Sequence, residues 1–453
     1  MRQTRRRTCL AGALVLAFAR ASLAAGAAAE GAVRIERLAD GFRLLRNGEP
    51  YFVKGGGGVD TAFLMDQLVA AGGNSIRTWS IREDSQPFLD MAQARGLTVS
   101  PTLWMGQDNN TPTSKQFDYA EAARVEALCD RARQAVLRFK GHPALLVWGV
   151  GNEMEHGGGG SPELWKTVEK IAAMIHQIDP DHPTMTVIAD LGREGEKVKR
   201  IMQYCPSLDI LGVNSYGGAV SLARRLAATG WDRPYIVTEF GANYLNLKTT
   251  PWGAKLEPPT TQRAAKLPEI YKASIAPGHP ACLGSYVFVW KQPAQWPGFH
   301  NCFTPAGERL GHVEAMTLAW TGQARQNRCP DIQPIASEAA GREVSPGAPI
   351  SAAVSAADPE GDALRARWEI RAEERGKSKS KPSFDRLIQS GEAAESNGVF
   401  PMAFAAPLEP GAYRLFVTVA DGAGNAAGGN MPFHAGAFAS QEQKGSSKTG
   451  AGP

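Results

Sequence analysis

Residues 145–153 read Leu-Leu-Val-Trp-Gly-Val-Gly-Asn-Glu, and residues 235–241 read Tyr-Ile-Val-Thr-Glu-Phe-Gly. Each stretch contains a short apolar run that is followed by an acid, Glu153 in the first and Glu239 in the second. A continuous apolar run of this length is typical of a strand that is buried on both faces of a parallel sheet. Burying a carboxylate beside such a strand costs free energy unless the group has a partner or a task. These two stretches therefore predict a buried parallel sheet with functional acids at the ends of two strands.

Six further runs of the same kind surround these two, and amphipathic helical patterns alternate with them. The eight runs lie at residues 51–54, 75–79, 97–103, 145–150, 185–188, 210–213, 235–238 and 284–289. The helical patterns include 121–139 and 162–178, and Ser161 is expected to cap the second of these helices. Eight strands that alternate with helices over about 270 residues match a (β/α)8 TIM barrel, an α/β fold. A doubly wound open sheet is disfavoured, because no glycine-rich phosphate loop with its pairing acid follows the first run.

The barrel is flanked by two regions with strand patterns. Asp40-Gly41 and Asn47-Gly48 predict tight hairpin turns, so we assign residues 30–324 to the barrel with a short N-terminal hairpin. Beyond the barrel, apolar residues alternate as in half-buried strands, and Tyr413 resembles the tyrosine corner of immunoglobulin-like domains. We therefore expect an immunoglobulin-like or PKD-like β-sandwich at residues 331–436, followed by a disordered tail at residues 437–453.

The N-terminal segment has the features of an export signal. Residues 1–24 contain five arginines, no acid and an apolar run at residues 10–19, which is the order of a secretory signal peptide. The run is shorter than the roughly 20 apolar residues that span a bilayer. Removing five positive charges from a formal net charge of +4 leaves −1. We therefore expect an exported protein, periplasmic or secreted, with neither nucleic acid nor membrane as a partner after cleavage.

The cysteines and a short acidic motif contain the residue types that can bind a metal. The cysteines lack CxxC spacing, so we expect no metal site among them and no cofactor. One pair among Cys282, Cys302 and Cys329 could form a disulfide in an oxidising compartment. The acids of the motif at residues 358–362, Asp-Pro-Glu-Gly-Asp, either hold calcium or form a turn with solvated carboxylates, and we expect the turn.

The two strand-end glutamates are the strongest functional signal. In a barrel, the residues that perform chemistry lie at the carboxyl ends of the strands, so Glu153 and Glu239 face each other across its mouth. A single acid there could simply anchor an arginine. Two acids that face one cavity suit cleavage of a glycosidic bond, in which one protonates the leaving oxygen and the other attacks the anomeric carbon.

The motifs around these glutamates resemble those of a known group of enzymes. They occur in chain order at residues 53–55, 74–77, 139–143, 145–153, 178–183, 212–216, 234–241 and 290. Over about residues 45–322 the sequence resembles the clan A glycoside hydrolases. Within that clan it is most similar to the barrels of family 2, the β-glucuronidase and β-galactosidase type. The region that enters the barrel also resembles that of the β-1,3-glucanosyltransferases.

The resemblance implies a role for individual residues. Glu153 would be the acid/base and Glu239 the nucleophile of a retaining double displacement through a covalent glycosyl-enzyme. Arg77 would keep Glu239 ionised, Tyr216 would donate a hydrogen bond to it, and Asn152 would bind the 2-hydroxyl of the sugar. The other expected substrate-binding residues are Asn214, Trp290, Trp79, Trp104 and Trp296. For the tryptophans, packing within the barrel mouth is an equally good interpretation.

The expected function is hydrolysis of a β-linked oligo- or polysaccharide, and a carbohydrate is the expected partner. Two alternatives use the same barrel. One is a transglycosidase with the same residues, and the other is a carbohydrate-binding barrel without turnover. A third hypothesis is adhesion through the C-terminal sandwich alone.

Overall fold

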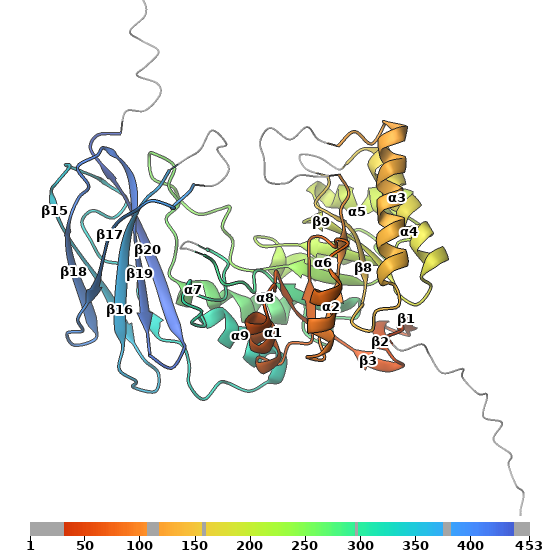
Figure 1. Ribbon diagram of the computed structural model, residues 1–453, viewed down its shortest axis with the longest axis horizontal. Coiled ribbons are helices and arrows are strands. Elements are labelled where there is room, and N and C mark those ends of the chain that lie inside the picture. The colour runs from red at the N-terminus through yellow and green to blue at the C-terminus, as the bar shows by residue number, and fades with distance from the viewer. Residues whose placement is uncertain (1–30, 107–116, 156–159, 295–297, 375–381, 439–453) are drawn as a thin grey trace, which may run out of the picture.

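The computed structural model describes residues 31–106, 117–155, 160–294, 298–374 and 382–438. Figure 1 shows a barrel surrounded by helices, with a β-sandwich beside it at the C-terminal, blue end of the chain. The predicted signal peptide at residues 1–24 and the tail from residue 439 onward lie outside the described residues.

The central sheet is a closed parallel barrel. Its strands, in chain order, are β4 (Val53–Gly57), β5 (Ser75–Arg77), β6 (Thr98–Ser100), β7 (Thr102–Leu103), β8 (Trp148–Asn152), β9 (Thr184–Ala189), β10 (Ile210–Asn214), β11 (Tyr235–Glu239) and β12 (Cys282–Val287). β12 pairs with β4, while β6 pairs with β5 and β7 pairs with β8. β6 and β7 are two halves of one strand divided by Pro101, which has no N–H to donate but whose carbonyl accepts from Gly149 at 2.8 Å. The predicted (β/α)8 barrel is therefore confirmed.

Helices cover the outside of this barrel. They are α1 (Ala62–Ala70), α2 (Gln86–Gln93), α3 (Ala122–Phe139), α4 (Pro162–Ile178), α5 (Glu196–Tyr204), α6 (Leu222–Ala227), α7 (Thr260–Ala264), α8 (Lys266–Ser274) and α9 (Gly311–Thr321). The start of α4 is as predicted, because the Ser161 hydroxyl accepts a hydrogen bond from Leu164 N at 3.1 Å and Pro162 opens the first turn. Among the described helices, none has the length and apolar character needed to cross a membrane.

A three-stranded antiparallel sheet closes the amino-terminal end of the barrel. It contains β1 (Val33–Leu38), β2 (Gly41–Arg46) and β3 (Glu49–Tyr51). Val33 N donates to Asp181 O and Phe42 N donates to Pro280 O, and both acceptors precede barrel strands. The predicted turn at Asn47-Gly48 has positive φ at both residues, 54° and 82°, as a type I′ hairpin requires. The carboxyl ends of the strands are left free for a site.

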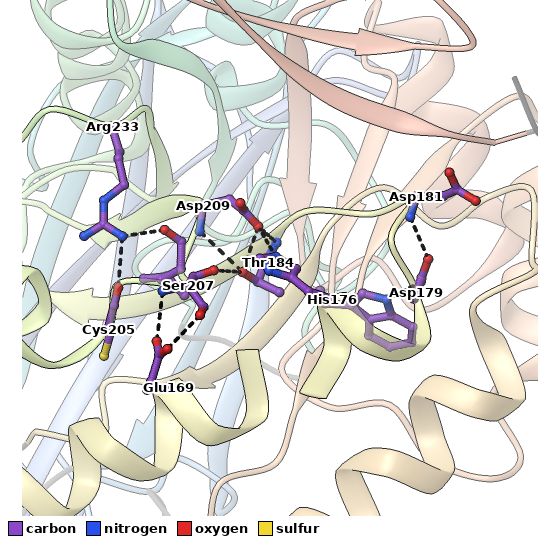
Figure 2. Close-up of polar contacts among 11 residues, drawn as sticks. Glu169, His176, Asp179, Asp181, Thr184, Cys205, Ser207, Asp209 and Arg233 are labelled. Atoms are coloured by element: carbon purple, nitrogen blue, oxygen red, sulfur yellow. Dashed lines mark hydrogen bonds and ion pairs between the residues drawn. The ribbon is translucent and has the colours of Figure 1, made fainter. Parts of the chain in front are cut away.

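A polar cluster ties α4 to the start of two barrel strands at this same end. Figure 2 shows Asp209 in contact with both Thr184 and His176. An Asp209 oxygen accepts from Thr184 N at 2.7 Å and lies 2.7 Å from His176 Nε2. The hydrogen bond to Asp209 raises the pKa of His176 above its usual value of 6.5. The protonated ring therefore contributes to stability through the Asp209 carboxylate.

We expect this contact to make stability depend on pH. The folded protein binds the His176 proton more tightly than the unfolded chain, so the contribution is full below about pH 6.5. It is lost as the pH rises through the folded pKa. His176→Gln should lower the free energy of unfolding by less than about 1 kcal/mol below pH 6.5, since both side chains are partly exposed, and by less above it. Denaturant unfolding at several pH values measures this, with His279→Gln as the control. A difference between wild type and variant that does not change with pH would contradict the expectation.

The C-terminal region is a β-sandwich, as predicted. Its smaller sheet contains β13 (Asp331–Ile332), β15 (Pro349–Ala357) and β18 (Val399–Ala405), and its larger sheet contains β14 (Glu343–Val344), β20 (Ala426–Ala435), β19 (Gly411–Ala420), β16 (Arg365–Ala372) and β17 (Leu387–Ala393). The Tyr413 hydroxyl donates to Glu409 O at 2.8 Å, which is the contact expected of a tyrosine corner. β15 and β18 lie on the side away from the barrel (Figure 1), so the five-stranded sheet is the one that faces it.

The described cysteines are all free and buried. The disulfide considered for one pair among Cys282, Cys302 and Cys329 is therefore not formed. Cys282 Sγ lies 3.6 Å from Gly284 O and Cys329 Sγ lies 3.4 Å from Arg309 O, so each thiol contacts a different backbone carbonyl. Burial raises the pKa of both thiols to about 12, which keeps them protonated and unreactive.

Candidate active site

The two glutamates lie at the carboxyl ends of β8 and β11, which are separated in the barrel by β9 and β10. Glu239 is the last residue of β11 and is only 6% exposed, while Glu153 directly follows β8. Glu153 has a backbone φ of 49°, which lies in the left-handed region that residues other than glycine rarely adopt. Its N–H donates to Val187 O at 2.9 Å, which holds the chain in this sharp turn beyond the strand. Backbone strain of this kind is often found at functional sites.

Glu239 is surrounded by hydrogen-bond donors. Arg77 Nη1 and Trp79 Nε1 donate to its Oε1 at 3.0 and 2.8 Å, and the Tyr216 hydroxyl donates to its Oε2 at 2.8 Å. Burial, and next the charge of Glu239, raise the pKa of Tyr216, so its hydroxyl keeps the proton that it donates. The Arg77 side chain is fully buried beside the carboxylate. Three donors therefore converge on this carboxyl group, two of them on Oε1 and one on Oε2.

Two asparagines connect Glu239's surroundings to Glu153. Asn152 Oδ1 accepts from Arg77 Nη2 at 2.6 Å and from Asn214 Nδ2 at 3.1 Å. Asn214 Nδ2 also donates to Glu153 Oε1 at 2.8 Å, and its Oδ1 accepts from Thr238 at 2.7 Å. The carbonyl of Asn152 is therefore engaged by protein donors, and the residue also lines a small pocket together with Trp79 and Trp104. Thr238, which orients Asn214, was not among the predicted residues.

Among the predicted site residues that the structure describes, Trp290 lies apart from the others. Trp290 is fully buried, donates from Nε1 to Leu64 O in α1 at 3.0 Å and packs against Trp320. It occupies the layer between the barrel and its helices, so the prediction that it lines a subsite is corrected here. The path of the backbone after β12 explains this position. The chain still runs beside β4 there, with Trp290 N donating to Gly57 O, and the Trp290 side chain lies against α1.

Two aromatic residues that the sequence analysis missed lie at the site instead. The Phe288 ring lies 5.8 Å from Trp79 and 5.9 Å from Tyr216 between centroids, and the His300 ring lies 5.0 Å from Tyr216. Both residues are half-buried. Phe288 could have been found from the sequence, because it lies two positions after Tyr286 in the predicted strand and alternate residues of a strand point to the same side. No signal in the sequence marks His300, which lies in a loop.

The remaining predicted tryptophans differ in their surroundings. Trp104 is 46% exposed, lies 5.0 Å from the Arg131 guanidinium, and lines a small pocket together with Trp79 and Asn152. It is therefore placed at the rim next to Asn152, where it is accessible to a ligand. Trp296 lies outside the described residues.

Two other acids at this end of the barrel have structural partners. Glu155 is buried and accepts from Ala189 N at 2.8 Å and from Lys197 Nζ at 3.0 Å. Asp190 accepts from Arg225 at 2.6 Å; burial alone would raise its pKa, but the hydrogen bonds from Arg225 and Ser215 outweigh burial and lower it. Both acids are thus paired with a cation and hold the ends of the neighbouring strands.

One group of acids has the composition of a metal site. One carboxylate oxygen from each of Asp358, Asp362 and Asp421 lies within 4.8 Å of the others. Asp358 Oδ1 accepts from Glu360 N at 2.9 Å and from Asp362 N at 3.0 Å. These bonds are those of the turn that the sequence predicts at this motif.

The chain matches one family model and is similar to several solved structures. The family model described as glycosyl hydrolases family 2, TIM barrel domain, matches residues 62–261. Similar solved structures include β-D-glucuronidase from Dictyoglomus thermophilum, with 19% identity, a TM-score of 0.47, and coverage of 64% of this chain and 54% of that one. β-Glucuronidase from Ruminococcus gnavus has 16% identity, a TM-score of 0.47, and coverage of 65% and 53%. Endo-1,4-β-mannanase from Eisenia fetida has 16% identity, a TM-score of 0.43, and coverage of 63% and 95%.

The chain spans about half the length of the two glucuronidases, and no curated protein matches it. The segment matched by the family model contains Arg77, Asn152, Glu153, Tyr216 and Glu239. The resemblance described from the sequence is confirmed by this match. Over residues 62–261, the barrel of this chain is similar to the TIM barrel domain of glycosyl hydrolases family 2.

Proposed function

We propose that this protein is a retaining β-glycosidase that acts on a β-linked oligo- or polysaccharide. The observation that carries the proposal is the pair of acids at the ends of β8 and β11. Glu239 receives three hydrogen bonds, one of them from the buried Arg77, and Asn214 links Glu153 to the same network by donating to Glu153 Oε1. The family-model match to a glycosyl hydrolase barrel supports the same function.

The surroundings of the two acids support different roles. The fully buried Arg77 guanidinium contacts the Glu239 carboxylate, which suits the nucleophile of the pair. Glu153 directly follows β8 and accepts from Asn214 through Oε1, and we assign to it the role of acid/base.

The proposed reaction has two steps. In the first, Glu239 attacks the anomeric carbon while Glu153 gives its proton to the leaving oxygen, so the glycosidic bond breaks and an ester forms. In the second, Glu153 takes a proton from water, which attacks the same carbon and releases Glu239. The Asn152 amide nitrogen would bind the 2-hydroxyl, a contact that strengthens in the transition state.

Covalent trapping tests this proposal directly. A panel of β-linked aryl glycosides and oligosaccharides first identifies the substrate by released product and by change in chain length. The matching 2-deoxy-2-fluoro glycoside with a good leaving group should then inactivate the enzyme. Peptide mass spectrometry should find one sugar per chain, attached to Glu239. A label on any other residue, or normal turnover without a label, would exclude the assignment of Glu239 as the nucleophile.

A further inference from the structure

We propose that the C-terminal sandwich contributes to catalysis by positioning a row of aromatic residues beside Glu239. This row, called the aromatic wall below, consists of Tyr244, Phe299, His300 and Tyr216. This inference rests on the proposed function. The connecting element is the loop at residues 240–259, which joins the end of β11 to α7 and is called the β11–α7 loop below. Arg414 and Lys255 act as positioning residues, since neither contacts the reacting atoms.

The sandwich holds this loop with a buried arginine. Arg414 lies on β19 with its side chain 1% exposed, and its Nη2 donates to both oxygens of Glu373 at 3.0 and 3.2 Å. The same guanidinium donates from Nη1 to Lys255 O at 3.0 Å, across the boundary between the two parts of the chain. Asn430 Nδ2 adds a second bond, to Glu257 Oε2 at 2.9 Å. Hydrogen bonds that are both charged and buried give this contact a defined geometry.

Lys255 carries the contact from the sandwich towards the barrel mouth. Its carbonyl is held by Arg414, while its side-chain Nζ donates to Leu245 O at 3.0 Å. The same Nζ lies 5.6 Å from the centre of the Tyr244 ring, within range of a cation–π interaction. Leu245 is 77% exposed, so the part of the loop that Lys255 holds has little apolar packing of its own.

A row of rings continues from Tyr244 to Glu239. The centroid distances are 4.9 Å from Tyr244 to Phe299, 4.8 Å from Phe299 to His300 and 5.0 Å from His300 to Tyr216. The Tyr216 hydroxyl then donates to Glu239 Oε2 at 2.8 Å. All these distances are those of direct ring contact.

A second buried arginine fixes the middle of this row. Arg263 in α7 is 3% exposed, donates from Nη1 to Phe299 O at 2.5 Å and lies 4.7 Å from the Phe299 ring. α7 itself is bonded to the sandwich, because Gly428 N donates to Thr260 Oγ1 at 2.8 Å. The aromatic wall is therefore supported by the sandwich along two routes, one through Lys255 and one through α7.

This arrangement predicts an effect on catalysis as well as on stability. Packed rings pass a displacement to their neighbours, since protein interiors leave few voids. A displacement of about 1 Å near reacting groups can lower a rate by about 10²-fold. If the sandwich were only a spacer, releasing the β11–α7 loop would leave kcat unchanged.

The first test replaces Lys255 and keeps the buried contacts of the sandwich. Lys255→Met should lower kcat by about 10-fold on the substrate found in the panel, with a smaller change in KM and little change in Tm. Lys255→Arg, which restores a donor, should recover most of the rate. Lys248→Met is the matched control, because Lys248 is an exposed lysine of the same loop, and it should behave as wild type. Equal kcat values for Lys255→Met and Lys248→Met would overturn the proposal.

The second test acts from the sandwich side and needs no substrate. Replacing Arg414 with Met and Glu373 with Leu together exchanges a buried ion pair for apolar side chains, which proteins often tolerate. Amide hydrogen exchange should become faster in the β11–α7 loop and in the peptide that contains Tyr216, while the sandwich strands stay protected. Unchanged exchange at Tyr216 would overturn the proposal even if the enzyme is active. If no β-glycoside is turned over, the proposed function fails, and this exchange measurement still decides whether the sandwich positions Tyr216.

Discussion

Glu239→Ala is expected to lower kcat on any β-glycoside that the wild type cleaves by on the order of 10⁵-fold. The variant has no carboxylate to attack the anomeric carbon, so the covalent step cannot take place. The three donors that face Glu239 would then point at an empty position, and Arg77 would lose the partner of its buried charge. Release of the aryl group, followed at the pH optimum of the wild type, measures the loss.

The control variants separate lost chemistry from lost folding. Glu239→Gln keeps the size of the side chain and one acceptor oxygen for Arg77 and Trp79, so it should stay folded and be as inactive as the alanine variant. Glu269→Ala removes an exposed glutamate from α8 and should retain full activity. If Glu239→Gln melts with the wild type and keeps activity within tenfold of it, Glu239 is not the nucleophile.

Glu153→Ala is expected to have the second-largest effect, and its size should depend on the leaving group. General acid catalysis contributes about 10²–10⁴-fold, so hydrolysis of an unactivated oligosaccharide should fall by that factor. An aryl glycoside with an acidic phenol needs no proton on its leaving oxygen, so formation of the glycosyl-enzyme should be affected far less. Azide needs no general base, so added azide should restore turnover and give the β-glycosyl azide.

The azide product makes this prediction specific to the acid/base. Two displacements at the anomeric carbon retain its configuration, so the β-azide indicates attack on an intermediate held by Glu239. Glu163→Ala, which removes an exposed acid from the first turn of α4, should show neither the leaving-group dependence nor the azide effect. An α-azide from Glu153→Ala would reverse the two assigned roles.

The barrel strands could be predicted because each is buried on both faces. Burial of this kind requires an apolar run, and the runs at residues 145–150 and 235–238 lie within or next to β8 and β11. Parallel strands run in the same direction, so the residues that follow them lie together at one end of the barrel. This is why Glu153 and Glu239 could be expected to share the barrel mouth, whereas Arg77 and Asn152 were expected there only from the family resemblance.

The positions of the aromatic residues around Glu239 could not be predicted in the same way. A tryptophan near a strand end can pack inward or outward, and the choice depends on the path of the backbone after the strand. Trp290 packs outward against Leu64 and Trp320, while Phe288 faces Trp79 and Tyr216. His300 reaches Tyr216 from a loop without a repeating pattern, so its place at the site depends on the tertiary structure.

The sequence by itself determined the barrel, the sandwich and the two acids at the strand ends, because burial and strand direction constrain these features locally. Only the tertiary structure decided what surrounds those acids and how the sandwich meets the barrel. The contact of Arg414 with the carbonyl of Lys255 joins residues 159 positions apart, and a backbone carbonyl as acceptor leaves no mark in the side-chain sequence. Interactions of this kind depend on how two folded parts dock, and no local pattern encodes them.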